Sequence, residues 1–271
     1  MYKLIALDID GTTVNAKHEI TERTKSAIAK ARAKGVLVML CTGRPIHGIR
    51  NYLEELDMNQ EGDYSITFNG ALIQDNFTGE VLVDLPLSEK EMHVLQELAD
   101  ELQLLTHYSD VKSIYTNHPV MPPYAVMESY ITTAPLQYVE RSKGFVGCSK
   151  FMISAEEDAF NKGYGAFPDE IHQNFMLTRT APYWVEITNK KASKGLAIAA
   201  LIEKLGIKQQ EVIAIGDQLN DASMIEFAGL GVAMGNAVDG IKNIANYITL
   251  DVEEDGVAHV IEKFVLEEND V

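Results

Sequence analysis

Short apolar runs alternate with amphipathic helical segments at both ends of this 271-residue chain. The first runs are residues 4–7, 36–40 and 64–68, and a helix is expected after each of the first two. Strands that lack polar alternation are buried on both faces, which is typical of parallel sheets connected by helices. The alternation therefore predicts an α/β fold built on a doubly wound parallel sheet.

The pattern changes in the middle of the chain. Between residues 83 and 186, short apolar runs mix irregularly with helical patches, and the βα alternation resumes only after about residue 190. A chain of this length is also long for a single hydrophobic core. We therefore predict a core domain made of residues 1–82 and 187–271, with residues 83–186 inserted between its halves as a separate α+β domain.

The charge balance and the cysteine content of the chain limit its partners. There are 23 Lys and Arg residues against 40 Asp and Glu residues, so a net charge of −17 repels nucleic acid and anionic membranes. The sequence has neither a basic stripe nor an apolar stretch of about 18 residues. Cys41 and Cys148 form no paired motif, which favours a reducing compartment. We expect a cytoplasmic protein without nucleic-acid or membrane partners.

Carboxylates and hydrogen-bonding residues gather where the expected strands end. Doubly wound sheets place their ligands at the carboxyl ends of the strands. In this chain those ends carry the segments Asp8-Ile9-Asp10-Gly11-Thr12, Thr42-Gly43-Arg44, Asn69-Gly70 and Gly216-Asp217-Gln218-Leu219-Asn220-Asp221. The four segments are therefore the candidates for a functional site.

Asp8 and Asp10 lie two residues apart after the first apolar run, so their side chains start on the same side of the strand. Neighbouring carboxylates repel each other, which raises one pKa unless a cation intervenes. The pair suits one carboxylate acting as nucleophile and metal ligand and the other as general acid and base. The alternative is a solvated junction in which Asp10-Gly11 only makes a turn.

Asp217 ends a second buried run, where nothing in the strand requires a charge. With Asp8 and Asp10 it forms an oxygen-only ligand set, which suits Mg²⁺. Asn220 and Asp221 follow it, and a role as a helix cap is the alternative for either residue.

Thr42 and Lys194 suit an anion. Thr42 and the backbone N–H of Gly43 lie at the start of an expected helix, a position that favours phosphate, although an ordinary N-cap is the alternative for Thr42. Lys194 belongs to a group of three lysines at the start of the expected helix 193–205. The helix dipole disfavours cations there unless an anion lies beside them.

Together these residues suit phosphoryl transfer. Asp8 would attack the phosphorus and form an aspartyl phosphate, and Asp10 would protonate the leaving oxygen and then deprotonate the hydrolytic water. Mg²⁺ held by Asp8, Asp10 and Asp217 would screen the nucleophile from the phosphate. Lys194 and Thr42 would hold the other phosphoryl oxygens.

The same segments, in the same order, resemble the motifs of the haloacid dehalogenase superfamily of phosphatases. The first, second and fourth motifs resemble residues 8–12, 42–44 and 216–221, and the third resembles Ser193-Lys194-Gly195. Two further segments resemble those of the Cof-type subgroup, the YidA-like sugar phosphatases: Phe68-Asn69-Gly70-Ala71 and Gly231-Val232-Ala233-Met234-Gly235-Asn236-Ala237.

This resemblance implies a Rossmann-like core with an inserted type IIB cap, in a Mg²⁺-dependent phosphatase that hydrolyses small phosphorylated metabolites, sugar phosphates in particular. It also implies that Asp10 offers Mg²⁺ its backbone carbonyl and that Asp221 supports the metal ligands from behind. Asn220 would bind the phosphoryl group, and Arg44 and Asn69 would neighbour the substrate. We expect a monomer or a homodimer.

Two alternatives stay open at this point. A phosphomutase would share the nucleophile and the cap but return the phosphoryl group to a sugar. A receiver-type signalling module also combines paired acids, Thr and Lys on a doubly wound sheet, but such modules are much shorter and lack an inserted domain. Within the insert, several side chains are candidates for leaving-group contacts, with packing at the surface or core edge as the alternative: His107, Tyr115, His118 and Arg179.

Overall fold

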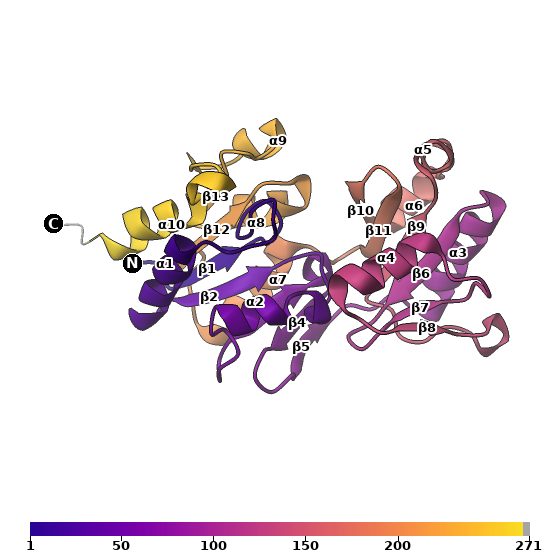
Figure 1. The fold of residues 1–271 in the computed structure, drawn as a ribbon, viewed down its shortest axis with the longest axis horizontal. Helices are drawn as coiled ribbons and strands as arrows, with labels where there is room; N and C mark the ends of the chain where they lie inside the picture. The colour runs from indigo at the N-terminus through magenta and orange to yellow at the C-terminus, as the bar shows by residue number, and fades with distance from the viewer. Residues whose placement is uncertain (268–271) are drawn as a thin grey trace. The chain divides into compact units, whose positions relative to one another are not determined.

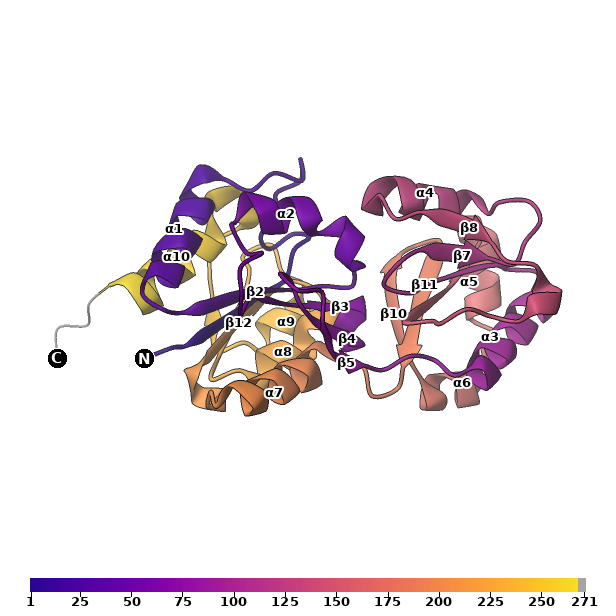
Figure 2. The same ribbon diagram turned by 90° about the horizontal axis from the view of Figure 1, so that it is seen from below.

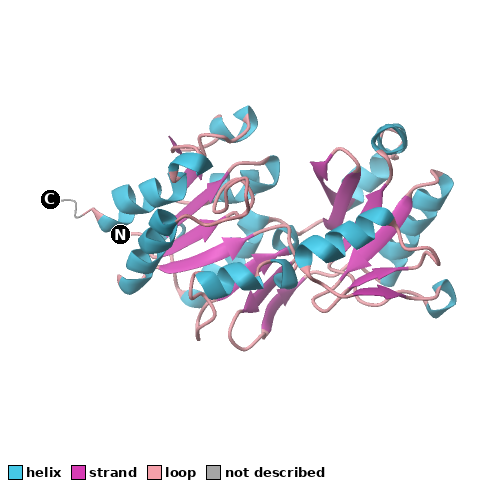
Figure 3. Ribbon diagram, viewed as in Figure 1, coloured by secondary structure: helices cyan, strands magenta, loops and turns pink. Residues whose placement is uncertain are grey.

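The computed structural model describes residues 1–267, and the chain folds into two compact units. The first comprises Met1–Gly43, Asn51–Val83 and the chain from Ser193 onward, and the second comprises Arg44–Arg50 and Asp84–Ala192. Residues 268–271, the end of the expected core domain, lie outside the described residues. Both units combine a sheet with helices (Figure 3).

The first unit is built on an eight-stranded sheet with the strand order β14-β13-β12-β1-β2-β3-β4-β5. The strands from β14 to β3 are parallel, and β4 returns antiparallel to β3. The predicted doubly wound parallel core is therefore confirmed. The strands are β1 (Leu4–Leu7), β2 (Leu37–Cys41), β3 (Tyr64–Thr67), β4 (Leu72–Asp75), β5 (Val81–Asp84), β12 (Val212–Gly216), β13 (Leu230–Ala233) and β14 (Tyr247–Ile248).

Helices cover both faces of this sheet, and for that reason β1 and β12 are buried throughout. In Figure 2, α1, α2 and α10 lie on one side of the strands, and α7 and α8 lie on the other. The helices are α1 (Glu22–Ala33), α2 (Arg50–Glu55), α7 (Lys194–Leu205), α8 (Ala222–Phe227), α9 (Asp239–Lys242) and α10 (Gly256–Ile261), followed by a π-helical turn at Glu262–Leu266.

The strand order reverses direction beside β1. From β1 the chain moves outward through β2 and β3, and after the second unit it returns to β12 on the other side of β1 and moves outward through β13. Such a switch point leaves a crevice at the carboxyl ends of the two central strands. The residues that directly follow β1, β2 and β12 therefore converge there.

The second unit contains a six-stranded sheet with the order β10-β11-β9-β6-β7-β8, antiparallel except where β7 pairs with β8. Helices α3, α5 and α6 pack on one face around a core that includes Tyr108, Phe151 and Phe160. Helix α4 lies on the opposite face (Figure 2). The elements are α3 (Glu89–Glu101), β6 (Leu105–Ser109), β7 (Ile114–Thr116), α4 (Pro123–Thr132), β8 (Leu136–Tyr138), β9 (Lys150–Ser154), α5 (Glu157–Tyr164), α6 (Asp169–Asn174), β10 (Phe175–Ala181) and β11 (Trp184–Asn189).

A group of charged side chains is buried beneath α4, and we call it the Glu128 cluster (His107, Glu128, Lys150 and Glu186). The Lys150 Nζ lies 2.8 Å from a Glu128 oxygen and 3.4 Å from a Glu186 oxygen. The His107 Nε2 lies 2.7 Å from the second Glu128 oxygen. All four residues are at least nine-tenths buried. Each charge is thus compensated by a neighbour, as buried ions require.

One predicted helix is interrupted. The apolar spacing predicts a continuous helix from Pro45 to about Leu56, but the structure has a 3-10 turn at Ile46–Gly48 and begins α2 only at Arg50. At the break, Ile49 has φ −128°, which no helix accommodates. None of the helices within residues 1–267 is both long enough and apolar enough to cross a bilayer.

Candidate active site

The two central strands β1 and β12 lie side by side (Figure 1), and Asp8 and Asp217 are the residues that follow them. Leu7 of β1 pairs with Ile215 of β12, and the backbone N–H of Asp8 donates to the carbonyl of Ile215 at 3.0 Å. Asp8 follows β1 directly and Asp217 follows β12 directly, so both carboxylates lie at the switch point. Their exposed fractions are 6% and 3%.

Lys194 connects the segment that follows β1 with the segment that follows β12. It is the first residue of α7, and Ser193 caps the helix by accepting a hydrogen bond from the N–H of Leu196. The Lys194 Nζ donates to a carboxylate oxygen of Asp8 and to one of Asp221, each at 2.6 Å. The side chain is fully buried. The anions expected beside this lysine thus include two carboxylates of the chain itself.

Asp221 is held entirely by protein groups. One of its carboxylate oxygens accepts the Lys194 hydrogen bond, and the other accepts from the backbone N–H of Asp217 at 2.9 Å and of Gln218 at 3.0 Å. The residue has no exposed surface. Asp221 therefore holds the turn that carries Asp217, and it also compensates the positive charge of Lys194.

Thr12 and Gly11 complete the contact between the first and last motifs. The Thr12 hydroxyl donates to Asp217 at 2.9 Å. Gly11 has φ +78°, and a Cβ there would lie 2.6 Å from the nearer Asp217 oxygen. Only glycine allows this close approach in the left-handed region.

We define the Asp8 cluster as Asp8, Lys194, Asp217 and Asp221, and within it the pKa values of Asp8 and Asp217 are raised. Burial is the main cause for Asp8, and repulsion from Asp221 and Asp217 adds to it, while Lys194 partly offsets both. Burial and Asp221 raise the pKa of Asp217 to about 6. Burial alone would lower the pKa of Lys194, but Asp221 and Asp8 raise it overall. The cluster holds three carboxylates against one ammonium and so has an excess of negative charge.

This charge excess fits a divalent cation. Asp8, Asp217 and Asp221 each offer a carboxylate oxygen, and these oxygens lie within 4.8 Å of one another. An all-oxygen donor set suits Mg²⁺. Asp221 already has all its oxygens engaged by hydrogen bonds, so Asp8 and Asp217 are the better direct ligands.

The Asp10 carboxyl does not belong to this buried group. Its side chain is 49% exposed, and its backbone bridges to that of Val14. The Asp10 side chain is therefore about half exposed, unlike the buried carboxylates of Asp8, Asp217 and Asp221.

Thr42, Asn69 and Asn220 lie at the same edge of the sheet. Thr42 follows β2, its N–H donates to the carbonyl of Ile66, and its own carbonyl accepts from the N–H of Asn69 at 3.0 Å. The Asn220 amide donates to the Asn69 side chain at 3.2 Å. Asn69 has φ 56°, a left-handed conformation that Asn tolerates better than most residues. The structure therefore brings together every strand-end segment of the first unit.

Residues 5–261 match the haloacid dehalogenase-like hydrolase family. The chain belongs to this family. The YxeH protein of Bacillus subtilis (strain 168) is 41% identical over 98% of this chain and 99% of its own length. Two other proteins of that strain, phosphatase YwpJ and 5-amino-6-(5-phospho-D-ribitylamino)uracil phosphatase YcsE, are 30% and 32% identical over 96% and 97% of this chain, and the alignments cover 98% and 96% of their own lengths.

Solved structures of the family share the fold. A haloacid dehalogenase-like hydrolase from Bacteroides thetaiotaomicron matches with a TM-score of 0.87 and 33% identity over 97% of this chain and 99% of its own. The subclass IIB sugar phosphatase BT4131 matches with a TM-score of 0.81 and 26% identity over 98% and 100%. The predicted superfamily, its Cof-type subgroup and the fold class are confirmed, and this haloacid dehalogenase-like hydrolase is a phosphatase, as expected.

Arg44 is the one predicted site residue of this hydrolase that falls outside the first compact unit. It belongs to the second compact unit, where its guanidinium donates to the carbonyl of Gly48 at 3.1 Å. The expected domain boundaries placed Arg44 in the core, and those boundaries stay a prediction. Lys190 also lies in the second unit and donates to the carbonyls of His172 and Phe175.

The sequence alone did not single out Thr12 or Asn236 as site residues. The Asn236 amide donates to the carbonyl of Gly11 at 2.8 Å, and its oxygen accepts from the N–H of Val252. Asn236 thereby anchors the turn after β1 to the turn after β13. Both residues lie inside segments that resemble the family, and that position was the only available signal.

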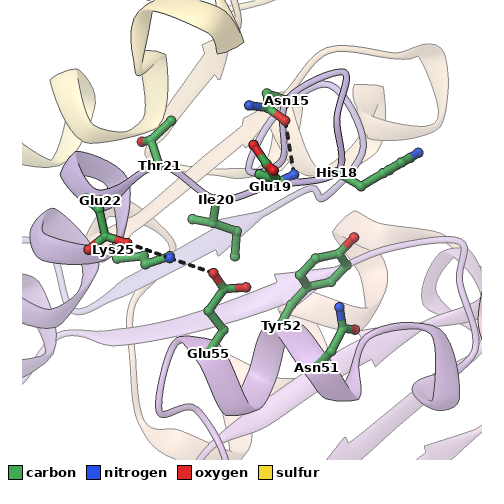
Figure 4. Close-up of a pocket in the computed structure, with 10 residues that line it drawn as sticks. All are labelled: Asn15, His18, Glu19, Ile20, Thr21, Glu22, Lys25, Asn51, Tyr52 and Glu55. Atoms are coloured by element: carbon green, nitrogen blue, oxygen red, sulfur yellow. Dashed lines mark hydrogen bonds and ion pairs between the residues drawn. The ribbon is translucent and has the colours of Figure 1, made fainter.

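A cavity of about 460 Å³ lies beside the turn that follows Asp10. Figure 4 shows that its wall comes from the loop before α1, the first turns of α1 and one side of α2. Lys25 crosses it and pairs with Glu22 and Glu55 at 2.8 and 2.6 Å. The lining is largely polar: Asn15, His18, Glu19, Ile20, Thr21, Glu22, Lys25, Asn51, Tyr52 and Glu55.

Proposed function

We propose that this phosphatase is Mg²⁺-dependent and hydrolyses small phosphorylated metabolites, sugar phosphates in particular, through an aspartyl phosphate on Asp8. The observation that carries the proposal is the buried Asp8 carboxylate, 2.6 Å from Lys194 and grouped with Asp217 and Asp221 at the switch point of the sheet. A carboxylate in this position has one hydrogen-bonded oxygen, and its other oxygen is the nucleophile.

Attack by Asp8 forms a bond from its carboxylate oxygen to phosphorus as the bond from phosphorus to the leaving oxygen breaks. Asp10 donates a proton to that oxygen. In the second step Asp10 takes a proton from water, which attacks the phosphorus, releases phosphate and restores the Asp8 carboxylate. Asp10 is more exposed than Asp8, which supports its assignment as the general acid and base, because a general acid must reach the substrate.

The transferring phosphoryl oxygens need positive and hydrogen-bonding groups. Lys194 provides the charge, and Thr42, the backbone N–H of Gly43 and Asn220 provide donors at the same edge of the sheet. Arg44 and Asn69 are proposed neighbours of the substrate. The buried position of Thr42, 2% exposed, supports a role at a closed site rather than a surface cap.

Asp8, the backbone carbonyl of Asp10, and Asp217 would hold Mg²⁺, with Asp221 supporting Asp217 from behind. When bound, the cation neutralises the carboxylates and the phosphoryl oxygens, so the nucleophile can approach an anion. The excess of buried negative charge and the raised pKa of Asp217 support this assignment.

Named relatives support the substrate class. BT4131 is named a sugar phosphatase, and YcsE is named for a substrate with a phosphorylated ribityl chain. Both names describe phosphate esters of hydroxylated carbon chains. In this proposal residues 83–186 form a cap that selects among such esters. A cytoplasmic location and a monomeric or homodimeric state stay predictions.

The test is hydrolysis of a panel of sugar, polyol and aryl phosphates with and without Mg²⁺, using the wild type, Asp8→Asn and Asp10→Asn. We expect turnover to require Mg²⁺ and to be lost in both variants, while both remain folded. Full activity in Asp8→Asn would rule out the covalent mechanism. A phosphomutase would instead move phosphate between positions of one sugar without releasing it.

A further inference from the structure

A tight turn places His18 beside Asp10. The Asn15 side-chain oxygen accepts from the backbone N–H groups of Lys17 and Glu19, both at 3.0 Å. The N–H of His18 donates to the carbonyl of Asn15, and the N–H of Asn15 donates to that of Glu19. Four hydrogen bonds within five residues therefore fix the position from which the imidazole projects.

The backbone of His18 is in the left-handed region, with φ 59°. Outside glycine this conformation is uncommon, although His, Asn and Asp adopt it more readily than other residues, and neighbouring bonds hold it in place. Here the Asn15 hydrogen bonds provide that restraint. Such conformations concentrate at functional sites, so His18 is a candidate for a role that requires its side chain at this place.

The imidazole lies next to the carboxyl of Asp10 without a hydrogen bond to it. The His18 Nδ1 is 3.8 Å from an Asp10 oxygen, which is beyond hydrogen-bond length. The two side chains are 65% and 49% exposed. In Figure 4 the His18 ring extends away from Tyr52 and from the centre of the cavity. Its nitrogens can therefore reach a molecule bound at Asp10.

The proposed mechanism limits what that molecule is. Asp10 must lie within hydrogen-bond distance of the leaving oxygen to protonate it. The carbon that carries this oxygen, and the substituents on the next carbon, then lie within a few ångströms of Asp10 and so within reach of His18. An imidazole presents a donor, an acceptor and a flat ring, which suit hydroxyl groups along a carbon chain.

We propose that His18 determines specificity by contacting a hydroxylated leaving group beside Asp10. This inference rests on the proposed function, because it requires Asp10 to meet the leaving oxygen. It does not require a change in the ionisation of either group, and it adds a residue of the core to the determinants of substrate choice.

The experiment compares kcat and KM of the wild type, His18→Gly, His18→Ala and Lys17→Ala on two esters. One is the sugar or polyol phosphate that the wild type hydrolyses fastest, and the other is phenyl phosphate, whose leaving group carries no further hydroxyl. Both His18 variants should raise KM for the hydroxylated ester roughly 10-fold and leave kcat/KM for phenyl phosphate unchanged. Lys17→Ala changes an exposed side chain of the same turn and should match the wild type on both esters.

The two His18 variants distinguish the effect of the imidazole from the effect of the left-handed backbone. His18→Gly removes the imidazole and relieves the left-handed strain, whereas His18→Ala removes the imidazole and keeps the strain, so thermal unfolding should favour His18→Gly. Equal losses on both esters, or an unchanged KM for the hydroxylated ester, would overturn the specificity role. A wild type that hydrolyses no ester of the panel would refute the proposed function itself, which is a different result.

Discussion

Each unit of this hydrolase buries a lysine between two carboxylates, and the two clusters differ in charge balance. In the Glu128 cluster, Lys150 and His107 face Glu128 and Glu186, and the pKa of Glu128 is lowered because attraction to Lys150 and His107 outweighs the cost of burial. In the Asp8 cluster, one ammonium faces three carboxylates, and the pKa values of Asp8 and Asp217 are raised.

This difference in charge balance distinguishes a structural ion cluster from the metal site that we propose. A balanced cluster is complete within the protein, and removing one member leaves an uncompensated charge. An unbalanced cluster is unfavourable on its own and becomes favourable when a cation binds. The direction of the carboxylate pKa shift therefore distinguishes the two, although both clusters are buried and hydrogen-bonded.

Substitution of the two buried lysines should give the largest difference between the two clusters in activity and stability. Lys194→Met should lower kcat by about 10²–10³-fold, because the developing charge on the phosphoryl group loses its ammonium. It should also lower stability at neutral pH, since Asp8 and Asp221 lose their counterion. Steady-state kinetics and denaturant unfolding measure the two effects. Retention of wild-type kcat would exclude Lys194 from the site.

Lys150→Met should lower the free energy of unfolding by about 3–5 kcal/mol, because Glu128 and Glu186 would remain buried without a cation. In contrast to Lys194→Met, its folded fraction should keep the kcat of the wild type on phenyl phosphate. The matched control is Lys112→Met, which removes an exposed lysine of the same unit. Equal stability of the two variants would show that the Glu128 cluster has no net effect on stability.

The polar residues at the strand ends of the first unit could be predicted from the sequence. In a parallel sheet that helices cover on both faces, the strands are buried and polar side chains lie at their ends. Buried strands must be apolar, so a carboxylate that follows one directly stands out, and the topology brings these ends together. For this reason Asp8 and Asp217, which follow two strands far apart in the sequence, could be related from the sequence to one site. A local motif is equally readable: Ser88 with Glu91 three positions later is the sequence pattern of a capping box, and the structure has both of its hydrogen bonds.

The Glu128 cluster was not predictable, because α4 reverses the usual pattern of an amphipathic helix. Its Glu128 is buried, whereas its Tyr130, Ile131 and Val126 are 86%, 50% and 48% exposed. A sequence pattern assigns the charged residue to solvent and the apolar residues to the core. His107, a candidate for a leaving-group contact, is instead fully buried and bonded to Glu128. The contacts of Glu128 in α4 with His107 in β6 and Lys150 in β9 are visible only in the three-dimensional structure.

Mg²⁺ should stabilise the Asp8 cluster and leave the Glu128 cluster unaffected. At 100 times its dissociation constant, a ligand that binds only the folded state adds about 3 kcal/mol. The Tm of the wild type should therefore rise with Mg²⁺, and that of Lys150→Met should rise by a similar amount from a lower start. Asp217→Asn should lose most of this rise. A rise of the same size in Asp217→Asn would place the cation elsewhere.

The smallest expected effects are changes in the free energy of unfolding of two carboxylate variants, measured in the presence of a metal chelator. These two changes should have opposite signs. The pKa of Asp217 is about 6 in the folded chain and 3.8 in the reference state, so its ionised form is disfavoured in the folded state above pH 6. Asp217→Asn should therefore stabilise the metal-free protein at pH 7, by at most about 3 kcal/mol for a shift of about two pKa units. The gain should vanish as the pH falls through 6 toward 4.

Glu128→Gln should act in the opposite direction. The pKa of Glu128 is lowered from 4.5, so its ionised form stabilises the folded chain above that pH and this contribution is lost as the pH falls below it. We expect a loss of about 2 kcal/mol at pH 7 that shrinks in acid. Urea unfolding of the wild type and both variants between pH 2 and 8 measures both pH dependences, because the Glu128 contribution is lost only below pH 4.5. Curves of the same sign would show that charge balance does not distinguish the clusters, whereas opposite signs would tie the instability of the Asp8 cluster to the cation it is proposed to bind.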